Sequence, residues 1–97
     1  MLDDETRQRE VYKAARGILD HLAANPLARD TAIGIARWWV GQPVQFVVEA
    51  LELLTQEGVV AEVSSRFGLS DKAATADMSN VYHVRTRFSD PPDDENK

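Results

Sequence analysis

The chain contains no cysteine, so disulfide bonds and thiolate metal sites are excluded. It also lacks any apolar run near the roughly 18 residues that a membrane helix needs, and no signal peptide opens it. Its two histidines, His21 and His83, stand far apart without a nucleophile or a metal-ligand motif beside them. We therefore expect a cytoplasmic protein that is not an enzyme, with no cofactor, no metal, no membrane contact and no small-molecule substrate.

Positive charge is also scarce, since 11 basic residues face 16 acidic ones and the formal net charge is −5. A dedicated nucleic-acid binder usually has a basic surface, because neutralised phosphates supply most of the non-specific affinity. Residues 90–97 alone contribute −3, and Pro91-Pro92 with this acidic run predict a disordered tail over residues 89–97. The rest of the chain is closer to neutral, which weakens the objection to a nucleic-acid partner without removing it.

Helical spacing of apolar residues predicts three helices, over residues 4–24, 31–40 and 43–57. Pro26 ends the first helix, because the residue before a proline is pushed out of the α region. Asp30 or Thr31 can cap the second helix. Pro43 suits the first turn of the third helix, and Gly58 suits its left-handed end.

The apolar pattern changes period after the third helix. Residues 59–67 alternate between apolar and polar and predict a strand, residues 68–80 read as a polar loop, and residues 81–88 alternate again. Two such strands after a helix predict a β-hairpin. The expected fold is mainly α with a β-hairpin, in one domain that spans residues 1–88.

This order of elements is that of a winged helix-turn-helix domain. Residues 35–44 (IARWWVGQPV) resemble the second helix and turn of bacterial transcriptional regulators such as the MarR, ArsR and GntR groups. Residues 50–60 (ALELLTQEGVV) are similar to the recurrent helix end of the same regulators. The resemblance covers about residues 10–88 and implies a three-helix winged helix-turn-helix that binds double-stranded DNA as a homodimeric regulator of transcription. Some winged helices instead serve protein–protein contacts alone.

On the DNA hypothesis the front of the third helix lies in the major groove, and Gln42, Gln45 and Glu49 read base edges. This helix is nevertheless acidic, because no Lys or Arg occurs between Gly41 and Ser65. Arginine to guanine is the commonest specific base contact, and carboxylates near phosphates are unfavourable. A helical projection places Gln45, Glu49, Glu52 and Gln56 outward, and Val44, Val47, Val48, Leu51 and Leu54 inward. The acidic stripe favours the alternative, a winged-helix protein–protein interaction module that does not bind DNA. The arginines of the predicted hairpin and the usual role of the fold favour DNA binding, which is the leading expectation.

Basic residues outside the third helix are the candidate phosphate contacts. The predicted wing carries Arg66, Lys72, Arg85 and Arg87, and the second helix is accompanied by Arg29 and Arg37. An alternative interpretation is that Arg85 pairs with Glu62 across the hairpin and that the other cations keep a sheet edge soluble.

Two further features bear on partners. Trp38 and Trp39 point about 100° apart on a helix, so we expect Trp39 between the helices and Trp38 partly exposed, where it could anchor an interface. Two core tryptophans packed against different helices are the commoner outcome. The first helix has a wide apolar stripe, which predicts a homodimer through this helix. The alternative is that the stripe covers the core of the same chain.

Overall fold

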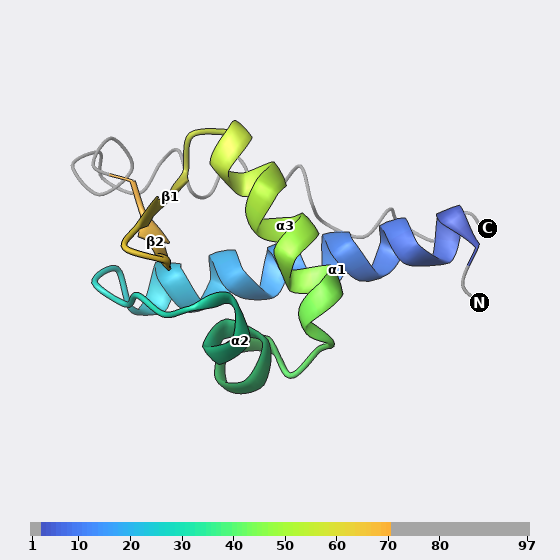
Figure 1. Ribbon diagram of the computed structural model, residues 1–97, viewed down its shortest axis with the longest axis horizontal. Coiled ribbons are helices and arrows are strands. Elements are labelled where there is room, and N and C mark those ends of the chain that lie inside the picture. Colours follow the sequence, from blue (N-terminus) through green and yellow to red (C-terminus); the bar gives the residue numbers. More distant parts are fainter. Residues whose placement is uncertain (1–2, 71–97) are drawn as a thin grey trace.

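The computed structural model describes residues 3–70. Along the chain it contains α1 (Asp4–Ala24), α2 (Ala32–Gly34), the π-helical turn η1 (Ile35–Val40), α3 (Val44–Gln56), β1 (Val60–Val63) and β2 (Arg66–Leu69). Figure 1 shows α3 crossing α1, with α2 and η1 on one side and the hairpin near the C-terminal end of α1. The described residues thus form one mainly helical domain with an antiparallel hairpin. The predicted strand 81–88 and tail 89–97 lie outside them.

The N-terminus of α1 is capped by Asp3, whose carboxylate accepts a hydrogen bond from the backbone N–H of Thr6 at 2.8 Å. The apolar stripe of α1 packs against α3 and η1 within the same chain. The stripe consists of Tyr12, which is partly buried, and of five buried residues: Val11, Ala15, Ile18, Leu19 and Leu22. In a single chain these side chains are already covered by the other helices.

The start of the second helix is capped by Thr31, whose hydroxyl accepts a hydrogen bond from the backbone N–H of Gly34 at 3.1 Å. The Asp30 carboxylate accepts instead from the backbone N–H of Thr31, at 2.8 Å. It lies so close to Gly34 that a Cβ there would stand 2.2 Å from the Asp30 Oδ1 atom. A glycine at position 34 is therefore explained by close packing.

The second half of the predicted helix 31–40 is a π turn, not regular α-helix. The Ala36 carbonyl accepts hydrogen bonds from the backbone N–H groups of both Gly41 and Gln42, and Gly41 ends the turn with φ +66°. Trp38 is 74% exposed, whereas the Trp39 ring stacks on that of His21 with centroids 4.2 Å apart. The arrangement with two core tryptophans, which is the favoured expectation from the sequence, is wrong, and Trp38 is exposed as the other expectation has it. Single π turns often occur at functional sites.

The predicted strand 59–67 is wrong in its extent, because the chain reverses within it. β1 and β2 pair antiparallel with Val60 opposite Leu69 and Val63 opposite Arg66. The turn consists of Ser64 and Ser65, with φ values of +54° and +65°. Two left-handed central residues are typical of a type I′ turn, which usually contains Asn-Gly. The serine pair lacks that signature, so the alternating pattern predicts one long strand where the chain in fact turns back.

A β-bridge ties the hairpin to the helices. The Asp30 backbone N–H donates to the Phe67 carbonyl at 3.2 Å, and the Phe67 N–H donates to the Asp30 carbonyl at 2.7 Å. Beside the bridge, the Arg29 side chain lies over Gly68, where an added Cβ would come within 2.7 Å of the Arg29 Cγ atom. The segment before α2 therefore runs along β2 and fixes the hairpin beside α3.

Candidate interaction surface

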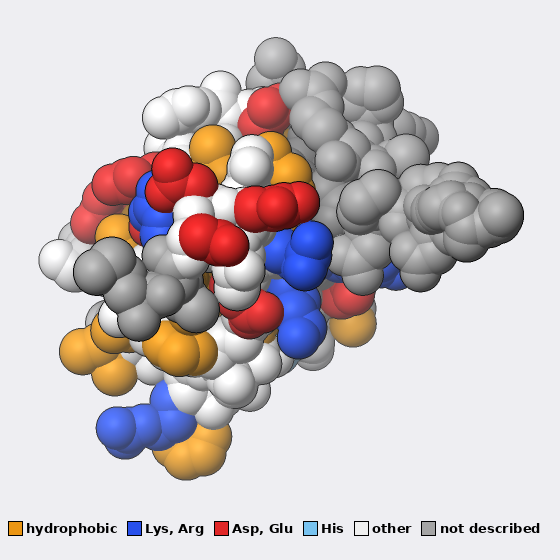
Figure 2. Space-filling model, turned by 90° about the vertical axis from the view of Figure 1, so that its right-hand side faces the viewer, with side chains coloured by type: hydrophobic (Ala, Val, Ile, Leu, Met, Phe, Trp, Pro, Cys, Tyr) orange, Lys and Arg blue, Asp and Glu red, His pale blue; other side chains and the backbone are white. Residues whose placement is uncertain are grey.

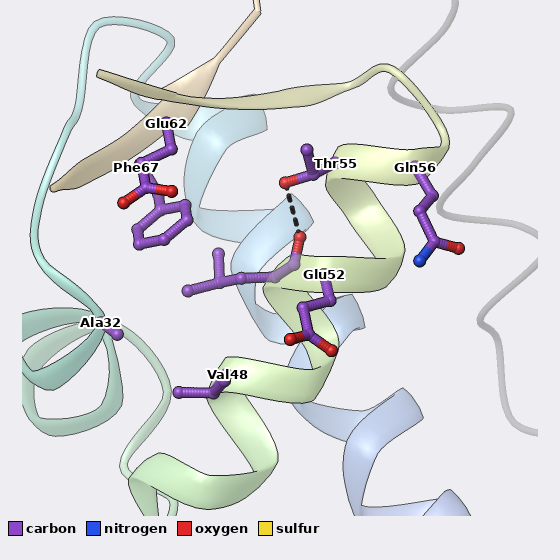
Figure 3. A pocket seen from close by; sticks show the side chains of 8 residues that line it. Ala32, Val48, Glu52, Thr55, Gln56, Glu62 and Phe67 are labelled. Atoms are coloured by element: carbon purple, nitrogen blue, oxygen red, sulfur yellow. Dashed lines mark hydrogen bonds between the residues drawn. The ribbon is translucent and has the colours of Figure 1, made fainter. Parts of the chain in front are cut away.

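A groove of about 580 Å³ separates α3 from the hairpin, and we call it the α3–hairpin groove. Figure 3 shows the Val48 side chain pointing from α3 towards Ala32 of α2, with Phe67 of β2 on the hairpin side of the groove. Leu51 of α3 also lines it. Its complete lining is Ala32, Val48, Leu51, Glu52, Thr55, Gln56, Glu62 and Phe67. The Thr55 hydroxyl is turned back onto the helix, where it donates to the Leu51 carbonyl at 2.7 Å. The floor of the groove is therefore apolar.

The buried side of α3 differs from the one that the helical projection predicts. Val47, Leu51 and Leu54 are buried as expected, but Val44 and Val48 are each 42% exposed. Phe46 and Ala50, which are not in the predicted inward set, are buried in their place. α1 packs against α3 and covers part of its surface, and Val48 lines the groove, which leaves its side chain exposed.

The predicted base-contact residues do not share one open surface. The Gln42 amide donates to the backbone carbonyl and to the carboxylate of Glu10 on α1, at 3.2 Å each. Glu49 forms an ion pair with Arg7, also on α1. Gln45, in the first turn of α3, is exposed. Two of the three side chains are thus engaged by α1.

The predicted phosphate contacts within residues 3–70 lie away from the groove. Arg66 is paired with Val63, and side chains of a strand alternate between its faces, so Arg66 lies on the face of the hairpin opposite to Phe67 and Glu62. Arg29 reaches the same outer face over Gly68. Arg37 is exposed on η1. Lys72, Arg85 and Arg87 lie outside the described residues.

Two carboxylates enter the groove from different walls. Glu52 extends from α3, and Glu62 extends from β1, where it stands opposite Phe67. Both are exposed, and neither forms an ion pair with another residue of the described range. The groove lining contains no lysine, arginine or histidine. The sequence alone did not predict this site, since its second wall depends on the serine turn; the polar Ser64-Ser65 pair within an alternating stretch was the available signal.

A second exposed apolar surface lies over α2 and η1. Ile33 is 62% and Trp38 74% exposed. Figure 2 views the molecule from the N-terminal end of α1 and shows carboxylates in its upper half. Hydrophobic side chains and a cation lie at its lower edge, where α2 and η1 are found. No described neighbour covers this surface, so it is available for contact but carries no further indication of a partner.

Several other kinds of site can be assessed for residues 3–70. No group of three or more histidine, aspartate or glutamate side chains in this range is placed to hold a metal ion. No helix in the same range is long and apolar enough to cross a membrane. Comparisons with known protein families, curated proteins and solved structures find no match to the chain.

Proposed function

We propose that the protein is a small winged-helix module that binds another polypeptide through the α3–hairpin groove. The observation that carries this proposal is the composition of the groove, whose floor is apolar and whose charged residues, Glu52 and Glu62, are both acidic. In winged-helix proteins that bind DNA, the third helix enters the major groove and phosphates surround this side of the domain.

The winged-helix assignment is supported by the order of the elements and by the bridge between Asp30 and Phe67. Three helical segments precede the hairpin, and the stretch before the second segment pairs with β2. This bridge is equivalent to a short third strand beside the wing. The hairpin β1–β2 is then the wing, in place of the longer one predicted from residues 59–88.

Electrostatics argue against a phosphate backbone at this surface. Two like charges 4 Å apart repel by about 1 kcal/mol in water and about 4 kcal/mol at the effective dielectric constant near a protein surface. Glu52 and Glu62 would both approach phosphates, and no cation in the groove lining offsets them. A polypeptide avoids this repulsion and also covers Val48 and Phe67, as the apolar centre of a protein interface does.

The first test is a titration of the full chain against a fluorescent duplex of mixed sequence. We expect no change in anisotropy at about 50 mM salt with protein in large excess, because phosphate contacts would be strongest under that condition. Binding that weakens steeply as salt rises would overturn the proposal in favour of DNA.

The second test places a photo-crosslinking amino acid at Val48 in the groove or, as a matched control, at exposed Lys13 on α1. In the native cell, the Val48 variant should give discrete protein adducts that resist nuclease, and the Lys13 variant should not. Adducts that nuclease removes, or equal adducts from both positions, would contradict a polypeptide site at the groove.

DNA binding is the second candidate, and it is favoured by a different observation. Arg29 and Arg66 share the outer face of the hairpin without a carboxylate partner among residues 3–70, and a wing can hold phosphates with such a pair. Lys72, Arg85 and Arg87 follow the hairpin in the sequence and would extend this cation set. Replacing Arg29 and Arg66 with alanine should then weaken binding to all sequences alike and reduce the salt slope by about 2.

Homodimerisation through α1 and a role in transcription stay predictions. Burial of the α1 stripe within one chain leaves few apolar side chains of this helix for a partner. Sedimentation equilibrium of the full chain tests the dimer directly, since a dimer through α1 would double the mass without involving the groove.

A further inference from the structure

We propose that the α3–hairpin groove recognises a short cationic segment of the partner protein, in which an apolar anchor is flanked by lysine or arginine. This inference rests on the proposed function and adds the chemical class of the ligand. The apolar floor selects the anchor, and Glu52 and Glu62 select the charge.

The floor is suited to one apolar side chain. Leu51 is 2% exposed and forms the base, while Val48 and the partly buried Phe67 ring stand on either side. A groove of about 580 Å³ falls within the roughly 300–1,000 Å³ range of common ligand sites. An isolated exposed valine needs no explanation, but an apolar floor between two walls offers contact area that a partner can bury.

The rim of the groove is acidic, and its two carboxylates form no ion pair with another residue of the described range. On neighbouring surfaces the carboxylates of Glu49 and Glu5 are paired with Arg7 and Arg9. Glu52 and Glu62 lack such a pairing among residues 3–70, although they face the same groove from opposite walls. Cations presented on both sides of an apolar anchor would complement this arrangement, whereas an acidic segment would be repelled.

The experiment is selection of random peptides displayed on phage against the immobilised full chain, followed by affinity measurement with synthetic peptides. Selected peptides should combine a large apolar residue with lysine or arginine nearby. The double variant Glu52→Gln/Glu62→Gln should bind them about fivefold or more weakly, because each exposed pair contributes modestly, and the difference should shrink at high salt. The matched control Asp4→Asn/Glu5→Gln removes the same charge from the start of α1 and should bind with unchanged affinity.

A second variant separates loss of charge from loss of fold. Val48→Asp changes an exposed position, so the chain should fold normally by circular dichroism, yet binding should fall at least tenfold because the anchor site becomes polar and more acidic. Equal affinity of wild type and the double variant, or selected peptides without cations, would overturn the cationic ligand while leaving polypeptide binding in place. A library that yields no peptide whose binding is weakened by Val48→Asp would also overturn the cationic ligand. The crosslinks from position 48 test polypeptide binding at the groove independently of the peptide selection.

Discussion

The two sides of α3 differ in how their polar groups are used. Towards α1, Glu49 pairs with Arg7, and just before α3 the Gln42 amide donates to Glu10. Val47, Ala50 and Leu54 of α3 are fully buried. Towards the hairpin, Glu52 and Glu62 have no such partner among the described residues, and Val48 is 42% exposed. One helix therefore serves the stability of the domain on one side and presents an open surface on the other.

The largest predicted effect is the loss of stability when a buried side chain of α3 is truncated. Leu54→Ala removes a fully buried side chain of α3 and should lower the free energy of unfolding by about 2 to 5 kcal/mol. Val48→Ala, on the groove side of the same helix, should change it by no more than about 0.5 kcal/mol. Urea unfolding of both variants measures the difference. Equal losses would show that the groove side is covered in solution.

The next effect strengthens the far wall of the groove. Ser64 and Ser65 both adopt left-handed conformations, which disfavour residues with a Cβ atom. Ser64→Asn/Ser65→Gly should stabilise the chain by about 1 kcal/mol, which raises the melting temperature by roughly 4–8 °C. Thermal unfolding followed by circular dichroism checks this expectation. Ser65→Ala keeps the steric conflict and should not stabilise; a destabilised Asn-Gly variant would argue against this turn.

A smaller effect compares carboxylates on the two sides. Glu49→Gln removes the partner of Arg7, and because this pair is partly exposed it should cost at most about 0.5 kcal/mol, less at high salt. Glu52→Gln removes a carboxylate without a described cation partner and should cause no loss of stability. Denaturant titrations at low and high salt distinguish the two variants. A larger loss for Glu52→Gln would place a structural partner at the groove.

The smallest predicted effect concerns the cap at the N-terminus of α1, the helix that packs against α3. The hydrogen bond from the Thr6 backbone N–H, together with one from its side chain, lowers the pKa of Asp3 below its ordinary value of 3.8. Because the folded pKa lies below the unfolded one, this stabilisation is complete above the unfolded pKa and disappears as the pH falls through the folded pKa. Asp3→Asn keeps a cap but does not titrate, so its stability should fall less than that of wild type between about pH 5 and pH 2. Parallel slopes for the two proteins would contradict this.

Apolar spacing and the positions of proline and glycine predicted the bounds of the long helices. They did not predict the π turn or the position of the hairpin turn. The bounds of α1 and α3 follow from apolar spacing, Pro26, Pro43 and Gly58, and they differ from the predicted ranges by at most one residue. The π turn of η1 and the reversal at Ser64-Ser65 carry no strong sequence signature, so both were missed. The candidate site was missed with them, because the hairpin forms one of its walls.

Composition and apolar spacing within the sequence establish that α3 is acidic, that it begins after Gln42 and that strand-forming residues follow it. Those properties depend on composition and on periodicity, which act within one segment. The tertiary structure alone decided which side of α3 is buried, because α1 approaches one side and the Asp30–Phe67 bridge holds the hairpin beside the other. It also separated Arg66 from Glu62, since strand alternation places these two side chains on opposite faces of the hairpin only once the register is set.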